Sequence, residues 1–382
     1  MALRTRTIVD QRVEAVKLVV EAGVAVSEVA ARNGVSRQAI YNWIEQYRAD
    51  PESGLNDRSR RPHTSPSRTP EDIEQRVIAE RQRWGFGSKK ILRRLQDEQP
   101  DVAWPPRSTI DAIFKRSGLA QARRYVRRRF APAPARRAYD TSAPGEVMTA
   151  DYKGQFRLRN GRYCYPLLVA DPVSRYLLAC DAYTGISFEQ AWGTFIRVFR
   201  EHGLPNIVHT DNGTPFGTSG QGRFSRISVR LMKYGIEPVY NRPGHPQDNG
   251  RHERLNRTLL EKACIDPEYD NTAQQARFDQ FRREFNQERP HESLGQDRPQ
   301  SRYRRSPREF PKREPVIEYE AHFETRIVDS KGRISWQGER PFFSDAFAGE
   351  RVGFERIDYS NWRIHYGSFV IGSFGPAHKR FL

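Results

Sequence analysis

Three acidic residues stand in settings that could support metal chemistry. Asp151 ends the alternating segment 147–152, Asp211 lies in His209-Thr210-Asp211-Asn212-Gly213, and Glu253 closes the run that begins at Pro243. Mg²⁺ prefers oxygen ligands, so carboxylates delivered by separate elements are the residue type such a site needs. Two ions roughly 3.5–4 Å apart can stabilise both the attacking and the leaving oxygen of a phosphodiester. The three acids therefore predict a divalent-metal site for phosphoryl transfer.

Each of these residues also has a plainer interpretation. An aspartate at a strand end more often caps a turn than binds a metal. Asp248 lies close to Glu253 in the sequence and competes with it for the role of third acid. His209 and His245 are better explained as hydrogen-bonded structural residues than as metal ligands. Spacing alone leaves the choice between Asp248 and Glu253 open.

An α/β domain is expected to position the acids. Besides segment 147–152, three strands are predicted, at 162–170, 175–180 and 206–209. Three helices are predicted, at 188–201, 250–262 and 273–287. This alternation indicates a mixed sheet, with two acids at strand ends and Glu253 on a helix.

The first fifty residues have the pattern of a helix-turn-helix domain. Two short helices are expected to meet at Gly34, with Ser27 and Ser36 as N-caps. The exposed side of the second helix would present four side chains to DNA base edges: Arg37, Gln38, Tyr41 and Asn42. The alternative is an ordinary three-helix bundle with a polar face.

Two basic segments flank a second predicted helix-turn-helix domain at 71–118. The linker 51–70 combines prolines with arginines that include Arg58, Arg60 and Arg61. Arg107, another expected DNA contact, lies in the segment that leads into the third helix of this domain, predicted at 109–117. The segment 119–144 is either a solvated linker or an arm that follows phosphates, and its arginine content favours the arm. Its expected DNA contacts are Arg123, Arg124, Arg127, Arg128 and Arg129.

After residue 315 the composition changes to short apolar segments separated by glycine-containing turns. Such segments recur every eight to twelve residues, which predicts a small all-β barrel of the SH3-like kind at 315–382. The chain as a whole is thus expected to be multidomain, with all-α modules first, the α/β core next and the barrel last.

The composition indicates a nucleic-acid partner. The 382 residues carry a formal charge of +17, and most of the basic residues are Arg, which binds phosphate through two parallel hydrogen bonds. A merely soluble basic protein is the alternative. The three cysteines have no paired spacing and so predict neither disulfides nor a Cys-rich zinc site. No apolar run is long enough for a membrane span, so a cytoplasmic protein is expected.

Two motifs carry a family resemblance over residues 145–305. His209 to Phe216, followed by His245-Pro246-Gln247-Asp248-Asn249-Gly250 with Glu253, closely resembles the integrase core shared by retroviral integrases and bacterial insertion-sequence transposases. The run from Asn286 to Gly295 resembles the closing motif of that family. The helix-turn-helix pattern at the N-terminus resembles the bacterial branch.

The resemblance implies an RNase H-like fold and a DDE transposase. It assigns Asp151, Asp211 and Glu253 as catalytic, metal-binding acids in place of Asp248. It implies two Mg²⁺ ions, with Mn²⁺ as a substitute, cleavage that frees a 3′ hydroxyl, and attack of that hydroxyl on target DNA. The implied partners are double-stranded DNA, as terminal inverted repeats and target, and further copies of the chain, acting at the bacterial nucleoid.

Some positions refine or depart from the family pattern. Gln247 and Arg257 are expected DNA contacts, Arg257 because the family often has a basic phosphate contact there. Leu260 lacks the charge of the Lys common in related transposases, and no Cys precedes Cys164, so no zinc module is predicted. A catalytically idle DNA-binding regulator and a simple RNase H-type nuclease are the competing functions.

Overall fold

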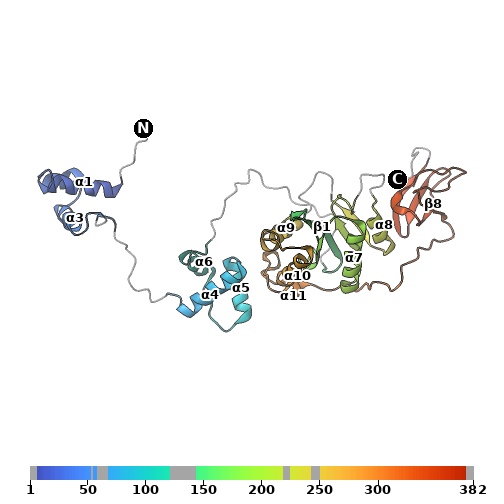
Figure 1. Ribbon diagram of the computed structural model, residues 1–382, viewed down its shortest axis with the longest axis horizontal. Helices are drawn as coiled ribbons and strands as arrows, with labels where there is room; N and C mark the ends of the chain where they lie inside the picture. The colour runs from blue at the N-terminus through green and yellow to red at the C-terminus, as the bar shows by residue number, and fades with distance from the viewer. Residues whose placement is uncertain are drawn as a thin grey trace. The chain divides into compact units, whose positions relative to one another are not determined.

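The computed structural model describes residues 7–52, 55–57, 68–120, 143–217, 224–241 and 250–375. The chain divides into two compact units, residues 1–70 and 71–382, and each is described by itself (Figure 1). Within the described ranges, no helix combines the length and apolar character needed to cross a membrane.

The first unit is a bundle of three helices: α1 (Ile8–Val20), α2 (Val26–Asn33) and α3 (Arg37–Ala49). Gly34 ends α2 with a φ of 66°, a left-handed conformation that favours glycine. Ser36 caps α3 by accepting a hydrogen bond of 3.2 Å from the Ala39 amide, as predicted. The prediction for Ser27 was wrong: the N-cap of α2 is Ala25, without a side-chain bond, and Ser27 lies inside the helix.

The second unit begins with another three helices, α4 (Glu71–Trp84), α5 (Ser88–Glu98) and α6 (Arg107–Arg116). Apolar residues at helical spacing, among them Val77, Ile91 and Ile110, are fully buried and form one cluster. The helices predicted for residues 71–118 are therefore present. We call residues 71–119 the second helical module.

The core of the second unit is a mixed sheet. Its strands are β1 (Val147–Tyr152), β2 (Phe156–Arg157), β3 (Tyr163–Ala170), β4 (Leu177–Tyr183), β5 (Ile207–Thr210) and β6 (Glu237–Tyr240). The order is β4-β3-β1-β5-β6, with β2 pairing the start of β3. β1 runs antiparallel to β3 and parallel to β5, and β5 runs parallel to β6.

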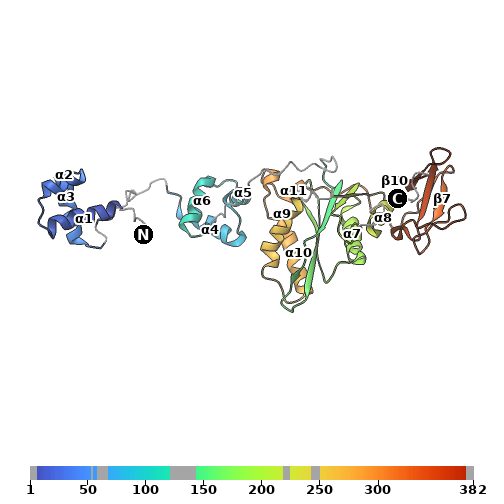
Figure 2. The same ribbon diagram turned by 90° about the horizontal axis from the view of Figure 1, so that it is seen from above.

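Helices cover both faces of this sheet. The first face packs on α7 (Phe188–His202) and α8 (Arg226–Lys233). The opposite face packs on α9 (Gly250–Leu259) and α10 (Asn271–Gln287). Figures 1 and 2 show β1 between α7 on one side and α9 and α10 on the other. β1 alternates between the faces: Met148 and Ala150 belong to the α7 cluster, so Thr149 and Asp151 point towards α9.

The helix predicted to run to Lys262 keeps α-helical geometry only to Leu259. It continues as a π-helix, η3 (Leu260–Cys264). Short elements follow α10: the 3₁₀ helix η4 (Glu292–Leu294) and α11 (Pro299–Arg302). The motif residue Asn286 links α10 to the sheet, since its side chain accepts from the Leu177 amide at 2.8 Å and donates to the Leu177 carbonyl at 2.9 Å.

The C-terminal region is an antiparallel four-stranded sheet. It contains β7 (Glu324–Ile327), η5 (Asp345–Phe347), β8 (Arg351–Arg356), β9 (Trp362–Tyr366) and β10 (Phe369–Phe374). The strand order is β10-β9-β8-β7, and over the described residues β7 and β10 do not pair, so these strands form an open sheet and not the closed barrel expected. One of the short apolar segments, 333–336, makes only isolated bridges, and Asp329 accepts hydrogen bonds from the Lys331 and Arg333 amides in the turn before it. Val229 and Met232 of α8 join this sheet's core.

Candidate active site

Asp151 and Asp211 are brought together by the register of two parallel strands. Ala150 of β1 pairs with Thr210 of β5, and each aspartate is the next residue along its strand. Neighbouring strands lie about 4.8 Å apart, so the two carboxylates leave the same end of the sheet side by side. Asp151 is 8% exposed and Asp211 is half-buried.

The electrostatics of this pair favour a bound cation. Burial raises the pKa of Asp151 above its usual range, and the hydrogen bond from Asn256 opposes that shift. Burial also raises the pKa of Asp211, and the negative charge of Asp151 raises it further. Two desolvated carboxylates that repel one another are stabilised in their charged forms when a positive charge lies between them.

The turn after β5 keeps the Asp211 carboxylate open. The Gly213 amide donates to Asp211 Oδ1 at 3.1 Å. A Cβ at position 213 would lie 3.1 Å from Asp211 Oδ2, which is tighter than an ordinary contact. Any residue larger than glycine would therefore crowd the carboxylate. Phe216, 2% exposed, anchors the end of the turn in the core.

Helix α9 connects the third predicted acid to this pair. Asn256 Nδ2 donates to Asp151 Oδ2 at 2.9 Å, which fixes the helix against the end of β1. Glu253 precedes Asn256 by three residues, so both lie on one flank of α9, and Glu253 is exposed. Over the ranges that the structure describes, no three His, Cys, Asp or Glu side chains are grouped closely enough to hold a metal ion. The structure thus brings two of the three acids together and places Glu253 about one helical turn from Asn256, the hydrogen-bond partner of Asp151.

Of the two histidines considered as alternatives, only His209 lies within the described residues. His209 is 7% exposed on β5, in register with Thr149. His245, Gln247 and Asp248 lie outside the described residues.

Several residues near the acids were not singled out from the sequence. His252, which precedes Glu253, is 3% exposed, and burial lowers its pKa to about 4. Lys90 of α5 has its pKa lowered to about 8 by burial and then by the charge of Arg289. Arg289 and His291 belong to the motif that begins at Asn286, so that motif could have pointed to both residues. Asn256 could have been found from its spacing to Glu253.

The proposed base-reading residues form an exposed surface on α3. Arg37, Gln38, Tyr41 and Asn42 are all exposed. Gln38 donates to Asn42 at 3.1 Å, which orders part of the surface. No ion pair of Arg37 occurs among the residues of the first unit that the structure covers.

The other predicted DNA contacts have mixed outcomes. Arg107 is exposed on α6, but it lies 3.6 Å from Asp111 and so shares its charge with a neighbour. Arg257 is exposed on α9. The remaining predicted contacts lie outside the described residues: Arg58, Arg60, Arg61, Arg123, Arg124, Arg127, Arg128 and Arg129.

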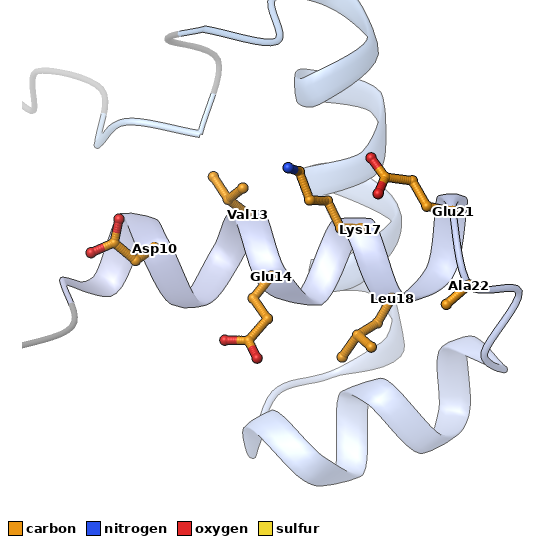
Figure 3. Close-up of a pocket in the computed structure, with 7 residues that line it drawn as sticks. All are labelled: Asp10, Val13, Glu14, Lys17, Leu18, Glu21 and Ala22. Carbon is orange, nitrogen blue, oxygen red and sulfur yellow. The ribbon is translucent and has the colours of Figure 1, made fainter.

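A hollow of about 480 Å³ runs along α1. Figure 3 shows that its lining comes from α1 and the turn after it, with the carboxylates of Asp10, Glu14 and Glu21 and the single amine of Lys17. Excess negative charge repels phosphate, so this surface is not suited to DNA. That α3 faces DNA stays a prediction, and the acidic surface of α1 does not compete with it.

Sequence comparisons agree with this geometry. A family model described as "Integrase core domain" matches residues 141–246, and a second model of the same description matches residues 234–299. This chain carries an integrase core domain. Asp151 and Asp211 fall within the first match and Glu253 within the second. A model described as "Transposase" matches residues 4–77, which include the whole of the α1–α3 bundle.

Individual relatives are distant. An insertion element IS476 uncharacterized 39.2 kDa protein of Xanthomonas euvesicatoria is 25% identical over 269 residues, covering 69% of this chain and 74% of that protein. The HTLV-2 integrase catalytic core domain in complex with magnesium is 17% identical, with a TM-score of 0.30, covering 42% of this chain and 95% of that one. The simian T-cell lymphotropic virus intasome in complex with the PP2A regulatory subunit B56 gamma is 12% identical, with a TM-score of 0.38, covering 78% and 95%.

Proposed function

We propose that the chain is a DDE transposase. It binds the terminal repeats of its element, cleaves to free 3′ hydroxyls and joins them to target DNA. The observation that carries this proposal is the pair Asp151 and Asp211, set side by side by strand register within an integrase core domain. The two desolvated carboxylates repel one another unless a cation is present, so the pair destabilises the fold by itself. It suits phosphoryl transfer, in which a divalent cation is bound between such groups.

The donor set fits a hard divalent cation. Asp151 and Asp211 supply oxygen ligands, and Glu253 is the candidate third ligand because it shares a flank of α9 with Asn256. Mg²⁺ bound there, as two ions or with Mn²⁺ in its place, supplies charge stabilisation of the phosphate and activation of the attacking oxygen. Asn256 positions Asp151 through its hydrogen bond and holds α9 in place.

The DNA is bound by several parts of the chain. We assign base reading to the exposed α3 residues, and phosphate binding to the arginines of 51–70 and 119–144 together with Arg107, Gln247 and Arg257. The two element ends must meet for joining, so the active species is a multimer of this chain.

The test is a joining assay on duplexes that carry the DNA flanking this gene, with Mg²⁺, Mn²⁺ or chelator. The wild type is expected to nick and join in a metal-dependent way, whereas Asp211→Asn and Glu253→Gln lose both activities. Asp248→Asn is the matched control because it removes a nearby carboxylate that the proposal leaves without a catalytic role. Joining that survives Asp211→Asn would sink the proposal.

Other outcomes identify the competing functions. Loss of joining in Asp248→Asn together with full activity in Glu253→Gln would make Asp248 the third acid. Metal-dependent cutting without joining or end specificity would indicate a nuclease. Specific end binding with no chemistry under any metal would indicate a regulator.

A further inference from the structure

A cavity of about 370 Å³ lies against α9 on the same side of β1 as Asp151, since Thr149 is one of its lining residues. Successive helical residues are offset by 100°, so Arg254 and Thr258 lie on one flank while Glu253 and Asn256 lie on the other. Arg254 and Thr258 line the cavity, and Asn256 contacts Asp151. Neither Asp151 nor Asp211 lines the cavity, but Thr149, two residues before Asp151 on β1, does, so the cavity adjoins the carboxylate pair. Its volume falls within the range of about 300–1,000 Å³ typical of small-ligand sites.

The rim of the cavity is strongly basic. Its cationic lining residues are Lys90, Arg175, Arg254, Arg257 and Arg289. Three carboxylates also line it, but two are already engaged. Asp171 accepts from Ser174 and from the Gly145 amide, and Glu292 pairs with Lys89 at 2.8 Å. Glu261 is the third. The remaining excess of positive charge suits a phosphate group.

The interior of the cavity offers hydrogen bonds that the described protein groups do not use. His252 lines it, is 3% exposed, and has no hydrogen-bond partner for either ring nitrogen among the described residues. His291 Nε2 is also buried without a partner there. Phe285 and Leu255 supply apolar walls. Buried polar groups are normally satisfied, so two unsatisfied imidazoles in an open cavity indicate a polar ligand.

The second helical module completes this cavity. Lys90 comes from α5, whereas the other cations come from the core. The module is attached beside the cavity, since Arg94 Nη1 donates to the Glu288 carbonyl at 2.9 Å and Lys262 Nζ to the Trp84 carbonyl at 2.8 Å. Arg289 lies over the Phe86 ring at 5.4 Å. The cavity thus depends on a contact between a helical module and the integrase core.

We propose that this cavity binds one nucleotide, with its phosphate against the rim cations and its base against the apolar wall of Phe285 and Leu255. A flat aromatic base matches the apolar wall, and its edge matches the unused ring nitrogens. The source of the nucleotide rests on the proposed function: it belongs to the DNA strand that passes the carboxylates. Thr149 lines the cavity and lies two residues from Asp151 on β1, roughly 6.6 Å along the strand, and stacked nucleotides rise about 3.4 Å, so the captured nucleotide lies roughly two positions from the attacked phosphate.

The test uses duplexes carrying the DNA that flanks this gene, with 2-aminopurine placed at each of the positions around the expected cleavage site in turn. Chelator is present throughout, so binding is measured without chemistry. The fluorescence of 2-aminopurine increases when the base leaves the stack. With the full-length wild type we expect an increase of about threefold at one position, and little change at its neighbours.

Two variants test whether the cavity is responsible. Thr258→Trp fills the cavity, and Arg289→Gln removes a rim cation with a small change in volume; both are expected to abolish the increase. Arg289→Gln also serves if Thr258→Trp does not fold. The matched control is Arg313→Gln, which removes an exposed arginine outside the cavity and is expected to keep the signal. An unchanged signal in both cavity variants would overturn the proposal.

A second arm separates a DNA nucleotide from a free one. Binding of dAMP to the wild type is measured by calorimetry without DNA. One outcome would show that the DNA assignment is wrong and that the ligand is a free mononucleotide. In that outcome one dAMP binds per chain, and Thr258→Trp or Arg289→Gln abolishes this binding. At the same time, no 2-aminopurine position in the DNA gives a fluorescence increase. Failure of the joining assay leaves this result intact, because the fluorescence measurement requires no metal.

Discussion

The two three-helix modules of this chain are built alike but use their cations differently. In the first unit, the exposed residues of α3 project from the bundle, and Arg37 has no ion-pair partner within the described part of the unit. In the second module, the cations of α5 point at the integrase core. Lys89 pairs with Glu292 at 2.8 Å and Arg93 with Asp297 at 3.1 Å.

Arg94 shows the difference most clearly. Its side chain is 3% exposed and contacts Glu80 at 3.3 Å, Glu98 at 2.8 Å and the Glu288 carbonyl. Trp84 lies over its guanidinium, 4.3 Å from the ring centroid. An arginine with its donors committed in this way has little left for phosphate. Positive charge on a helix therefore identifies a DNA surface only when the charges lack protein partners.

Removing Arg94 tests this comparison with the largest expected effect. Arg94→Ala leaves Glu80 buried and without its closest cation, so we expect a loss of about 3 kcal/mol in the second module. That loss corresponds to roughly a hundredfold faster amide exchange in α4 and α5. Hydrogen–deuterium exchange with mass spectrometry measures it.

The control for this change is Lys115→Ala, which removes an exposed cation from α6 of the same module. Its expected effect stays within about 0.5 kcal/mol. Equal exchange in the two variants would show that Arg94 is not structural, and the contrast between the modules would be lost.

A smaller effect is expected from Leu55 in the first unit. Leu55 is 3% exposed and packs in the α1–α3 core, and Arg12 donates to its carbonyl at 3.0 Å. Leu55→Ala is expected to destabilise the bundle by about 2 kcal/mol, because it leaves a cavity. Exchange of the α1 and α3 amides reports the change. Ile8→Ala, at a side chain that is 64% exposed, is the control; an effect as large as that of Leu55→Ala would contradict the role given to Leu55.

Leu55 also shows where sequence reasoning about the fold stops. Periodicity located most of the helices and strands, because burial of one face repeats at a fixed interval, but α8 and β6 were not predicted. Leu55 is a single apolar residue in a segment rich in proline and arginine, so no period marks it. The open C-terminal sheet was missed for a related reason: even spacing indicates strands, but it does not say whether the first pairs with the last.

The candidate site was predictable where identity and spacing carried the information. Asp151 and Asp211 could be placed at strand ends from the alternation before them, and the register then brings them together. The cavity beside α9 could not be predicted, because its lining comes from segments distant in sequence, from Lys90 to Arg289. The motif around Arg289 was recognised, but its packing against α5 depends on the docking of the second module.

DNA affinity offers a third test of the comparison between the modules. Arg37→Ala removes a cation that has no ion-pair partner among the described residues, so we expect about tenfold weaker binding to the flanking DNA and a smaller salt dependence. Fluorescence anisotropy at several salt concentrations gives both quantities. Arg107→Ala is the matched change in the second module, and a smaller loss is expected because Arg107 shares its charge with Asp111. Equal losses would remove the functional distinction between the modules.

The smallest effect is expected from the partly exposed pair that joins the second module to the core. Arg93 and Asp297 keep side-chain exposures of 39% and 22%, so water screens their attraction. A double-mutant cycle of Arg93→Ala and Asp297→Ala is expected to give a coupling energy of about 0.5 kcal/mol, which falls as salt is added. A coupling as large as the effect of Arg94→Ala would mean that exposed ion pairs, and not the buried Arg94 contacts, hold the module against the core. The observed burial of Arg94 favours the smaller value, because a guanidinium removed from water depends on its protein partners far more than one that water still reaches.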